Sequence, residues 1–159
     1  MRNQLSIVTA CLSLFSFVAC TSTKKAPATT GELVTNISVQ QPVKVGSPLM
    51  LTFTVSNTSG KELKFCKWHT PFEGFKNSYF NIKNSNGEEV RYKGIMAKRI
   101  MPPPADAYTT VPAGKSVTVS IDLLKAYDVA AAGKYQITYD GSGMSGLEKV
   151  NEATFIVTE

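Results

Sequence analysis

Apolar and polar residues alternate one by one along several short stretches of this chain, and this feature constrains its fold more than any other. Side chains of a β-strand point alternately to its two faces, so the alternation predicts strands with one buried face. Only one turn of helix is expected, within residues 123–129. We therefore expect an all-β fold. The expected strands include Leu33–Val39, Leu51–Ser56, Val117–Leu123, Tyr135–Asp140 and Ala153–Val157.

Turn-forming residues separate the expected strands at short, regular intervals. Asn86-Gly87 lies between the apolar stretches 80–82 and 90–92, and this pair is typical of a tight β-hairpin. Gly133-Lys134-Tyr135 at the start of a late strand is typical of a tyrosine corner, in which the phenol bonds to backbone upstream. Short strands at this spacing predict an antiparallel, immunoglobulin-like β-sandwich. Further turns are expected at Asn57–Gly60, Pro112–Gly114 and Ala132–Gly133.

The amino-terminal residues 1–19 have the charge and apolar run of a signal peptide. Phe17-Val18-Ala19-Cys20 resembles the lipobox of bacterial lipoproteins, with Phe17 in place of the usual leucine. We expect cleavage before Cys20, lipid on Cys20, a tether over 20–31 and the sandwich over 32–159; an uncleaved membrane anchor is the alternative. The expected location is the bacterial cell envelope. Thr21 rather than aspartate follows the cysteine, which resembles the outer-membrane sorting pattern of Gram-negative cells, so we expect the outer membrane.

Histidine and cysteine are too scarce for several kinds of site. The chain of 159 residues has one histidine, His69, which excludes a multi-histidine zinc site or an HExxH protease. Of its three cysteines, Cys11 leaves with the signal peptide and Cys20 carries the lipid. Cys66 then has no internal partner, and we expect it to be buried or to pair between molecules. No metal or cofactor is expected.

No arrangement of residues indicates catalysis. Residues 141–146 spell G-x-G-x-x-G, but a dinucleotide site needs a following helix, and the pattern over 148–158 predicts a strand. We therefore expect a flexible hairpin loop at 141–146. His69 has no G-x-S-x-G nucleophile motif to serve. We expect a protein that is not an enzyme.

The positive charge is concentrated in the middle of the chain. Residues 61–99 hold nine bases, four acids and seven aromatic residues, whereas the whole chain has a net charge of +5. Two interpretations remain open: solvated strand faces over a core, or a surface that binds an acidic protein or anionic envelope polymers. An exported protein rarely meets nucleic acid, so we expect none as a partner.

Two segments break the alternation and are candidates for binding. Residues 67–75 place large aromatic rings beside proline and glycine, and such rings either close the end of a sandwich or contact a partner. Residues 101–107 contain three consecutive prolines and are expected to be stiff and extended. A stiff loop loses little entropy when it binds.

Residues 51–139 carry a series of motifs that resembles a known family. The motifs include Lys67-Trp68-His69-Thr70-Pro71-Phe72-Glu73-Gly74, Tyr92-Lys93-Gly94, Lys98-Arg99, Pro103, Tyr108, Pro112-Ala113-Gly114-Lys115-Ser116, Ala126-Tyr127-Asp128 and Gly133-Lys134-Tyr135. In this order they resemble the amino-terminal, propeptide-like domain of deuterolysin and peptidyl-Lys metalloendopeptidases, the aspzincins. His69 replaces an expected asparagine, and Asp106-Ala107-Tyr108 replaces an adjacent Asp-Tyr pair. A weaker similarity is to bacterial intracellular proteinase inhibitors.

The resemblance implies a monomeric, free-standing module that binds or inhibits a zinc metalloprotease in trans, because no catalytic domain follows Gly146. It implies that Trp68 and Phe72 act as anchors and that Lys98 or Arg99 enters a pocket for lysine; His69 or Glu73 is placed near the partner's zinc. The alternative is a structural or chaperone-like envelope lipoprotein that binds anionic components or another protein. The candidate contact residues are Lys67, Trp68, His69, Thr70, Pro71, Phe72, Glu73, Lys98, Arg99, Pro103 and Tyr108.

Overall fold

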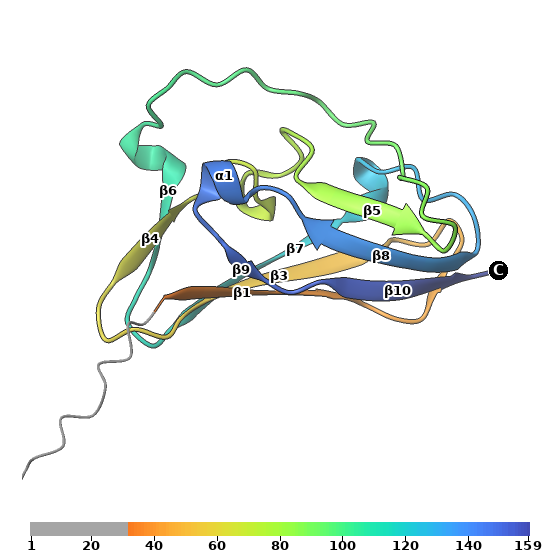
Figure 1. Ribbon diagram of the computed structural model, residues 1–159, viewed down its shortest axis with the longest axis horizontal. Helices are drawn as coiled ribbons and strands as arrows, with labels where there is room; N and C mark the ends of the chain where they lie inside the picture. The colour runs from red at the N-terminus through yellow and green to blue at the C-terminus, as the bar shows by residue number, and fades with distance from the viewer. Residues whose placement is uncertain (1–31) are drawn as a thin grey trace, which may run out of the picture.

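Two four-stranded sheets and a small two-stranded sheet make up the fold. The computed structural model describes residues 32–159, so the predictions for the signal peptide, for Cys20 and for the tether up to Gly31 lie outside the described residues. One sheet has the order β7-β3-β1-β9 and the other β2-β10-β8-β5 (Figure 1). The strands are β1 (Leu33–Val39), β2 (Val43–Lys44), β3 (Met50–Asn57), β5 (Phe80–Asn84), β7 (Ser116–Asp122), β8 (Gly133–Tyr139), β9 (Lys149–Val150) and β10 (Ala153–Thr158).

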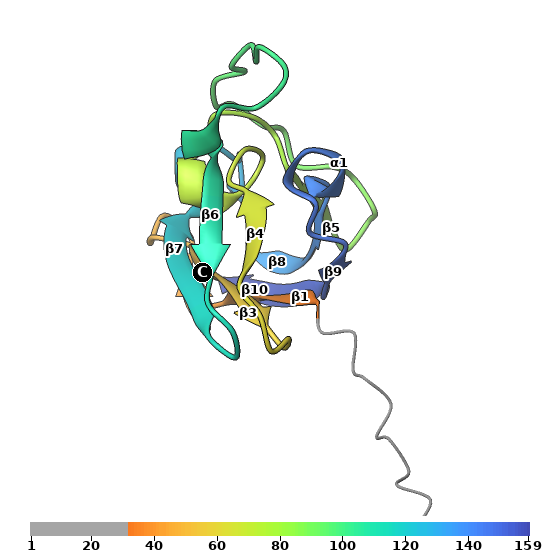
Figure 2. The ribbon, with the colours of Figure 1, turned by 90° about the vertical axis from the view of Figure 1, so that its left-hand side faces the viewer.

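The third sheet pairs β4 (Leu63–Cys66) with β6 (Tyr108–Val111), and Figure 2 shows the two side by side. The antiparallel pairs β1–β3, β3–β7, β8–β10 and β5–β8 carry most of the structure. Two short parallel pairs, β1–β9 and β2–β10, complete the edges. The predicted β-sandwich is confirmed.

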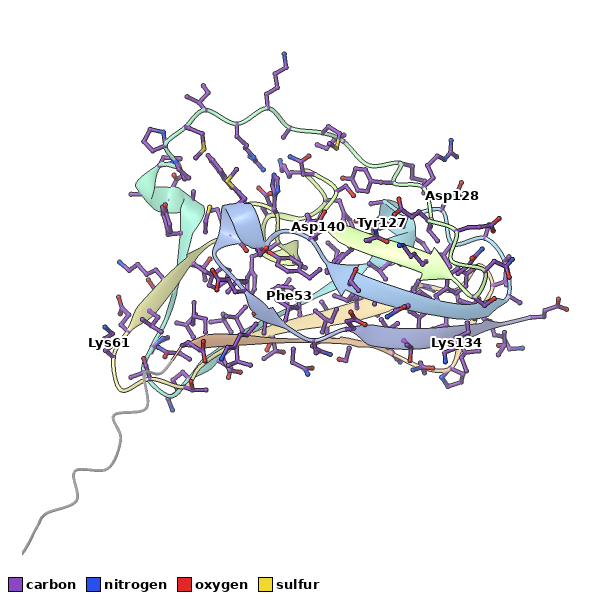
Figure 3. The ribbon with its side chains drawn as sticks, viewed as in Figure 1. Phe53, Lys61, Tyr127, Asp128, Lys134 and Asp140 are labelled. Carbon is purple, nitrogen blue, oxygen red and sulfur yellow. The ribbon has the colours of Figure 1, made fainter. Side chains whose placement is uncertain are left out.

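Strand β3 shows how the alternation builds the core. Leu51, Phe53 and Val55 are fully buried, and Phe53 lies between the layers in Figure 3. The intervening hydroxyls face β7, where Thr54 Oγ1 lies 3.0 Å from Thr118 Oγ1. Burying large apolar side chains is the main favourable contribution to folding, about 1.5–3 kcal/mol for each.

Several local predictions hold in detail. The Tyr135 hydroxyl donates to the carbonyl of Ala131 at 2.9 Å, which forms the predicted tyrosine corner. Cys66 is a free and buried thiol. A single 3-10 turn, η3 (Leu123–Lys125), follows β7 where one helical turn was expected. The Asn86-Gly87 turn forms with Gly87 at φ 82°, but its returning arm pairs only at isolated positions such as Glu89.

The segment 141–146 differs from the predicted hairpin loop. It contains the short helix α1 (Ser142–Ser145), which ends at Gly146 in the left-handed region (φ 76°). The segment leads from β8 to β9, and these strands belong to different sheets. The expected strand 148–158 is also interrupted at Asn151, between β9 and β10. The Asn151 amide replaces a strand partner there: its Oδ1 accepts from Ile37 N at 2.6 Å and its Nδ2 donates to Ile37 O at 3.0 Å.

No helix in the described part of the chain is long and apolar enough to cross a membrane.

Candidate functional site

A capped turn begins the irregular segment that the sequence singled out. Thr70 is fully buried; its hydroxyl donates to Lys67 O at 2.6 Å and accepts from Phe72 N at 3.2 Å. This caps the 3-10 turn η1 (Pro71–Glu73), in which Pro71 fits because an initial turn needs no amide hydrogen there. Gly74, at φ 73°, ends the turn. Thr-Pro-Phe-Glu-Gly is therefore a self-contained structural turn.

His69 has a left-handed backbone, with φ 58°. Its N–H donates to Glu73 Oε1 at 2.7 Å, and its carbonyl accepts from the Tyr139 hydroxyl at 2.9 Å. Asparagine and histidine are among the few residues enriched in this region. Histidine can therefore stand where the resemblance led us to expect asparagine, because both tolerate the backbone that the turn requires.

The aromatic rings of this segment pack inward and close one end of the sandwich. Phe72 meets Phe65 and Phe53 edge-to-face, with ring centroids 5.2 and 6.2 Å apart. Phe75 stacks on Tyr79 at 5.9 Å. Trp68 is 9% exposed and packs with Cys66, Ala107 and Met144 in a second small cluster. This burial gives Trp68 and Phe72 a structural role, and little of the Trp68 ring is available as the anchor that the resemblance implied.

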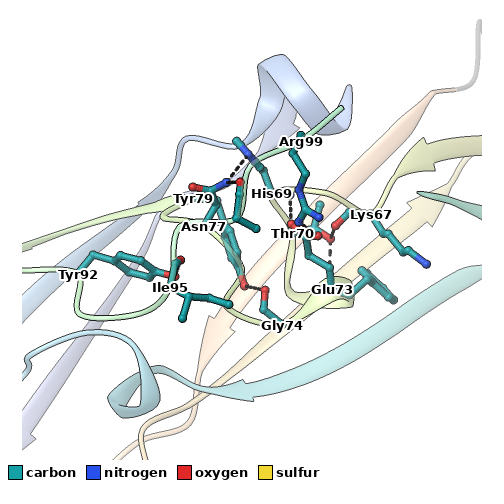
Figure 4. A network of polar contacts seen from close by, with 12 residues as sticks. Lys67, His69, Thr70, Glu73, Gly74, Asn77, Tyr79, Tyr92, Ile95 and Arg99 are labelled. Atoms are coloured by element: carbon teal, nitrogen blue, oxygen red, sulfur yellow. Dashed lines mark hydrogen bonds and ion pairs between the residues drawn. The ribbon is translucent and has the colours of Figure 1, made fainter. Parts of the chain in front are cut away.

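Arg99 connects this segment to a second one. Its guanidinium forms an ion pair with Glu73, whose side chain is only 6% exposed, and lies 4.7 Å from the centre of the Trp68 ring (Figure 4). Arginine suits such a site because its planar guanidinium pairs with a carboxylate and stacks on a ring at once. Arg99 is thus committed to contacts within the domain, whereas its neighbour Lys98 is exposed.

Residues 94–104, here called the 94–104 loop, pass over this end of the molecule as the long arch at the top of Figures 1 and 2. Three further contacts hold it in place. Tyr92 Oη donates to Ile95 O at 2.9 Å, Ala97 N donates to Lys76 O at 2.8 Å, and Asn77 Nδ2 donates to Ala97 O at 3.3 Å. Together with Arg99, these contacts fix the middle of the loop against the domain.

Asn77 contacts both His69 and the 94–104 loop. The Asn77 Nδ2 atom lies 3.1 Å from His69 Nε2 and donates to Ala97 O (Figure 4). A carbonyl oxygen only accepts, so the amide must present its nitrogen to this corner. The second hydrogen of the same NH₂ group then points to His69 Nε2, which accepts it. Asn77 therefore joins the His69 ring to the 94–104 loop.

The outer side of the 94–104 loop is apolar, which the sequence interpretation missed. Ile95, Met96, Ile100 and Met101 are 61%, 68%, 87% and 61% exposed. An exposed apolar patch on a folded domain marks a surface for interaction. The available signal was the pair of apolar dipeptides on either side of Lys98-Arg99, outside any alternating stretch.

Four tyrosines, of which Tyr79 and Tyr127 are buried and Tyr92 and Tyr139 are half-buried, support the two segments from below. Burial raises the pKa of Tyr92 to about 12, and it also raises the pKa values of Tyr79, Tyr127 and Tyr139 above their ordinary value. The phenols therefore keep their protons and donate to backbone carbonyls; Tyr79 bonds Gly74 O at 3.1 Å and Tyr127 bonds Phe80 O at 3.0 Å.

The predicted contact residues fall into two groups. Residues 67–73 and Arg99 meet in one network, and Tyr108, 44% exposed, pairs with Cys66 beside them. Lys98 and the half-buried Pro103 lie on the 94–104 loop without joining this network. Among residues 32–159 there is no group of three or more histidine, cysteine or acidic side chains that could hold a metal ion. The arrangement places an exposed apolar surface over a base of packed side chains.

Several bases of the 61–99 segment lie beside acids. Arg91 and Lys93 both face Asp128, at 2.9 and 3.9 Å, and the Arg91 hydrogen bond lowers the pKa of that carboxyl. Lys83 lies 3.9 Å from Glu89 and Lys64 lies 3.8 Å from Glu62. Glu62 and Glu89 belong to the segment and are already counted in its charge, so these pairs place acids among the bases but leave the segment with an excess of positive charge.

Comparison with known proteins gives the class of the domain. A family model of immunoglobulin-like domains matches residues 21–153, and the chain belongs to this family. An extracellular protease of Aeromonas hydrophila is 33% identical over 89 residues, 56% of this chain and 25% of that protein. An uncharacterized secreted protein of Arthroderma benhamiae is 32% identical over 109 residues, 65% of this chain and 56% of that protein.

The chain thus spans a quarter of one relative and about half of the other. Both relatives are extracellular or secreted by their names, which agrees with an envelope or extracellular location. Among solved structures, the CARDB domain of a Pyrococcus furiosus protein aligns at a TM-score of 0.37 and 16% identity. That alignment covers 80% of this chain and 87% of the other, and its score supports no argument about function.

Proposed function

We propose that this immunoglobulin-like domain binds and restrains an extracellular zinc metalloprotease in trans, as a propeptide-like module. The similarity to part of a secreted protease supports this proposal, since the matched 89 residues are only a quarter of that protein. The motifs from Lys67 to Tyr135 point to the aspzincins as the class of partner.

The observation that carries the proposal is the 94–104 loop. It exposes four large apolar side chains, yet it is fixed to the domain through Ile95, Ala97 and Arg99. A loop that is already ordered loses less conformational entropy on binding, so more of the contact energy appears as affinity. The buried Trp68 ring supports this surface from beneath through its contact with Arg99.

We place the protein in the bacterial envelope, held at the outer membrane by lipid on Cys20. The lipobox-like Phe17–Cys20 and the secreted nature of the relatives support this placement. In this proposal Cys20 sets where the domain acts, and the contacts with the partner come from residues 32–159.

The test measures whether the full chain and a Cys20→Ser form inhibit two enzymes. One is the extracellular protease of Aeromonas hydrophila, and the other is an aspzincin from the cell that makes this protein. Both forms should slow peptide hydrolysis equally in solution. Ile100→Asp should weaken inhibition by about tenfold or more, because it places a charge in an apolar contact. Ile156→Asp is the matched control, since Ile156 is also exposed (51%) but lies on β10. Absence of both inhibition and binding would refute the proposal.

Binding to anionic envelope components is the alternative function, and it predicts strong salt dependence. Acids lie beside four of the bases that such binding would use, namely Arg91, Lys93, Lys83 and Lys64.

A further inference from the structure

The 94–104 loop has the side-chain arrangement of a β-strand although it pairs with no strand. Over residues 96–100, Ala97 and Arg99 are half-buried and the Arg99 side chain contacts the domain, whereas Met96, Lys98 and Ile100 are exposed. This alternation has the period of two that defines an extended chain. One row of side chains therefore anchors the loop and the other row faces away.

The backbone of the loop is open on one edge. The Ala97 N–H donates to Lys76 O, and the Ala97 carbonyl accepts from Asn77 Nδ2, so both groups face the domain. In an extended chain the polar groups of neighbouring residues point to the opposite edge. Within residues 32–159, the main-chain groups of Met96 and Lys98 form no hydrogen bond, so this edge can pair with another chain.

We propose that residues 96–100 enter the substrate cleft of the partner protease as an extended strand, with Lys98 in its central pocket. This inference rests on the proposed function and specifies how the domain binds the protease. An endopeptidase cleft pairs with the backbone of an extended segment and takes alternate side chains into pockets. The row Met96, Lys98, Ile100 fits a cleft with an acidic pocket between two apolar ones.

The contacts beneath the loop distinguish it from an ordinary substrate. Arg99 is held by the Glu73 ion pair and the Trp68 ring, and Ala97 is held by Lys76 and Asn77. Residues on both sides of Lys98 are thus tied to the domain, and Pro102–Pro104 stiffen the chain that follows. The strand cannot adjust freely to the catalytic groups, so it occupies the cleft without efficient turnover.

The experiment measures how the full chain inhibits hydrolysis of a short peptide by the Aeromonas hydrophila extracellular protease. Inhibition should be competitive, raising the apparent KM and leaving kcat unchanged. Lys98→Glu should raise the inhibition constant by about 10- to 100-fold, since it reverses the charge that meets the acidic pocket. Lys134→Glu, on the exposed side of β8, is the matched control and should inhibit like the unchanged chain.

The outcomes separate the two proposals. Binding with non-competitive inhibition, or equal inhibition by the Lys98 and Lys134 variants, would overturn the cleft-binding mode and leave the proposed function standing. Rapid cleavage of the loop with loss of inhibition would also overturn it. Absence of any binding would overturn both.

Discussion

At the scale of single residues, the site depends on side chains that each make two or more contacts. His69 accepts the left-handed backbone, receives a hydrogen from Asn77 and contacts Glu73 and Tyr139 through its main chain. Glu73 in turn receives the His69 N–H and the Arg99 guanidinium. A change at one of these positions therefore affects both the 67–75 turn and the 94–104 loop.

The backbone of His69 leads to the first prediction. His69→Asn should change the free energy of unfolding by less than about 1 kcal/mol, because asparagine tolerates a positive φ. His69→Val should lower it by about 1–3 kcal/mol, because a β-branched residue is strained in that region. Urea unfolding of the two variants measures the difference. Equal stabilities would show that the strain is relieved by movement of the turn.

At the scale of elements, the strands could be predicted because alternation is a local property of the sequence. Leu51, Phe53 and Val55 identify β3 without knowledge of any partner strand. The break at Asn151 could not be predicted, since it depends on pairing with Ile37, 114 positions away. The surface of the 94–104 loop was missed for a similar reason, because the contacts of Ala97 and Arg99 are made by distant residues.

The break between β9 and β10 gives a prediction at this scale. Asn151→Ala removes two hydrogen bonds to the backbone of Ile37, a residue that is 1% exposed. Leaving both groups unpaired should cost about 2–4 kcal/mol of unfolding free energy. Gln136→Ala, which removes an exposed bond to Glu152, should cost less than about 1 kcal/mol. Chemical denaturation compares the two, and an equal loss would mean that the Asn151 contacts add little.

At the scale of the whole molecule, one end of the sandwich is filled by aromatic side chains. Tyr79 packs against Phe80 and Phe75, and Tyr127 against Tyr92 and Phe80. Their hydroxyl groups bond to backbone in different segments, so the phenols join β5, the 67–75 turn and the 94–104 loop. The rigidity of the exposed loop thus depends on groups that must stay protonated.

This dependence predicts loss of stability in alkaline solution. The pKa of Tyr92 is raised to about 12 in the folded protein and is about 10 in an unfolded chain. A raised pKa favours the protonated, folded form, so its contribution is complete below about pH 10 and is lost as the pH rises toward about 12.

Circular dichroism and tyrosinate absorbance, followed together from pH 8 to 12, provide the measurement. Tyr92→Phe should weaken the pH dependence over this range, whereas the control Tyr108→Phe, at an exposed position, should leave it unchanged. Ionisation of Tyr92 well before any structural change would contradict the prediction.

The place where the described chain begins has a further consequence. Strand β1 begins in the lower part of Figures 1 and 2, and the 94–104 loop crosses the top in both views. In copies held through their amino-terminal ends, the loop would lie on the side of the domain away from the attachment. A layer of such copies would be a multivalent surface, on which a protease released from one loop meets another before it diffuses away.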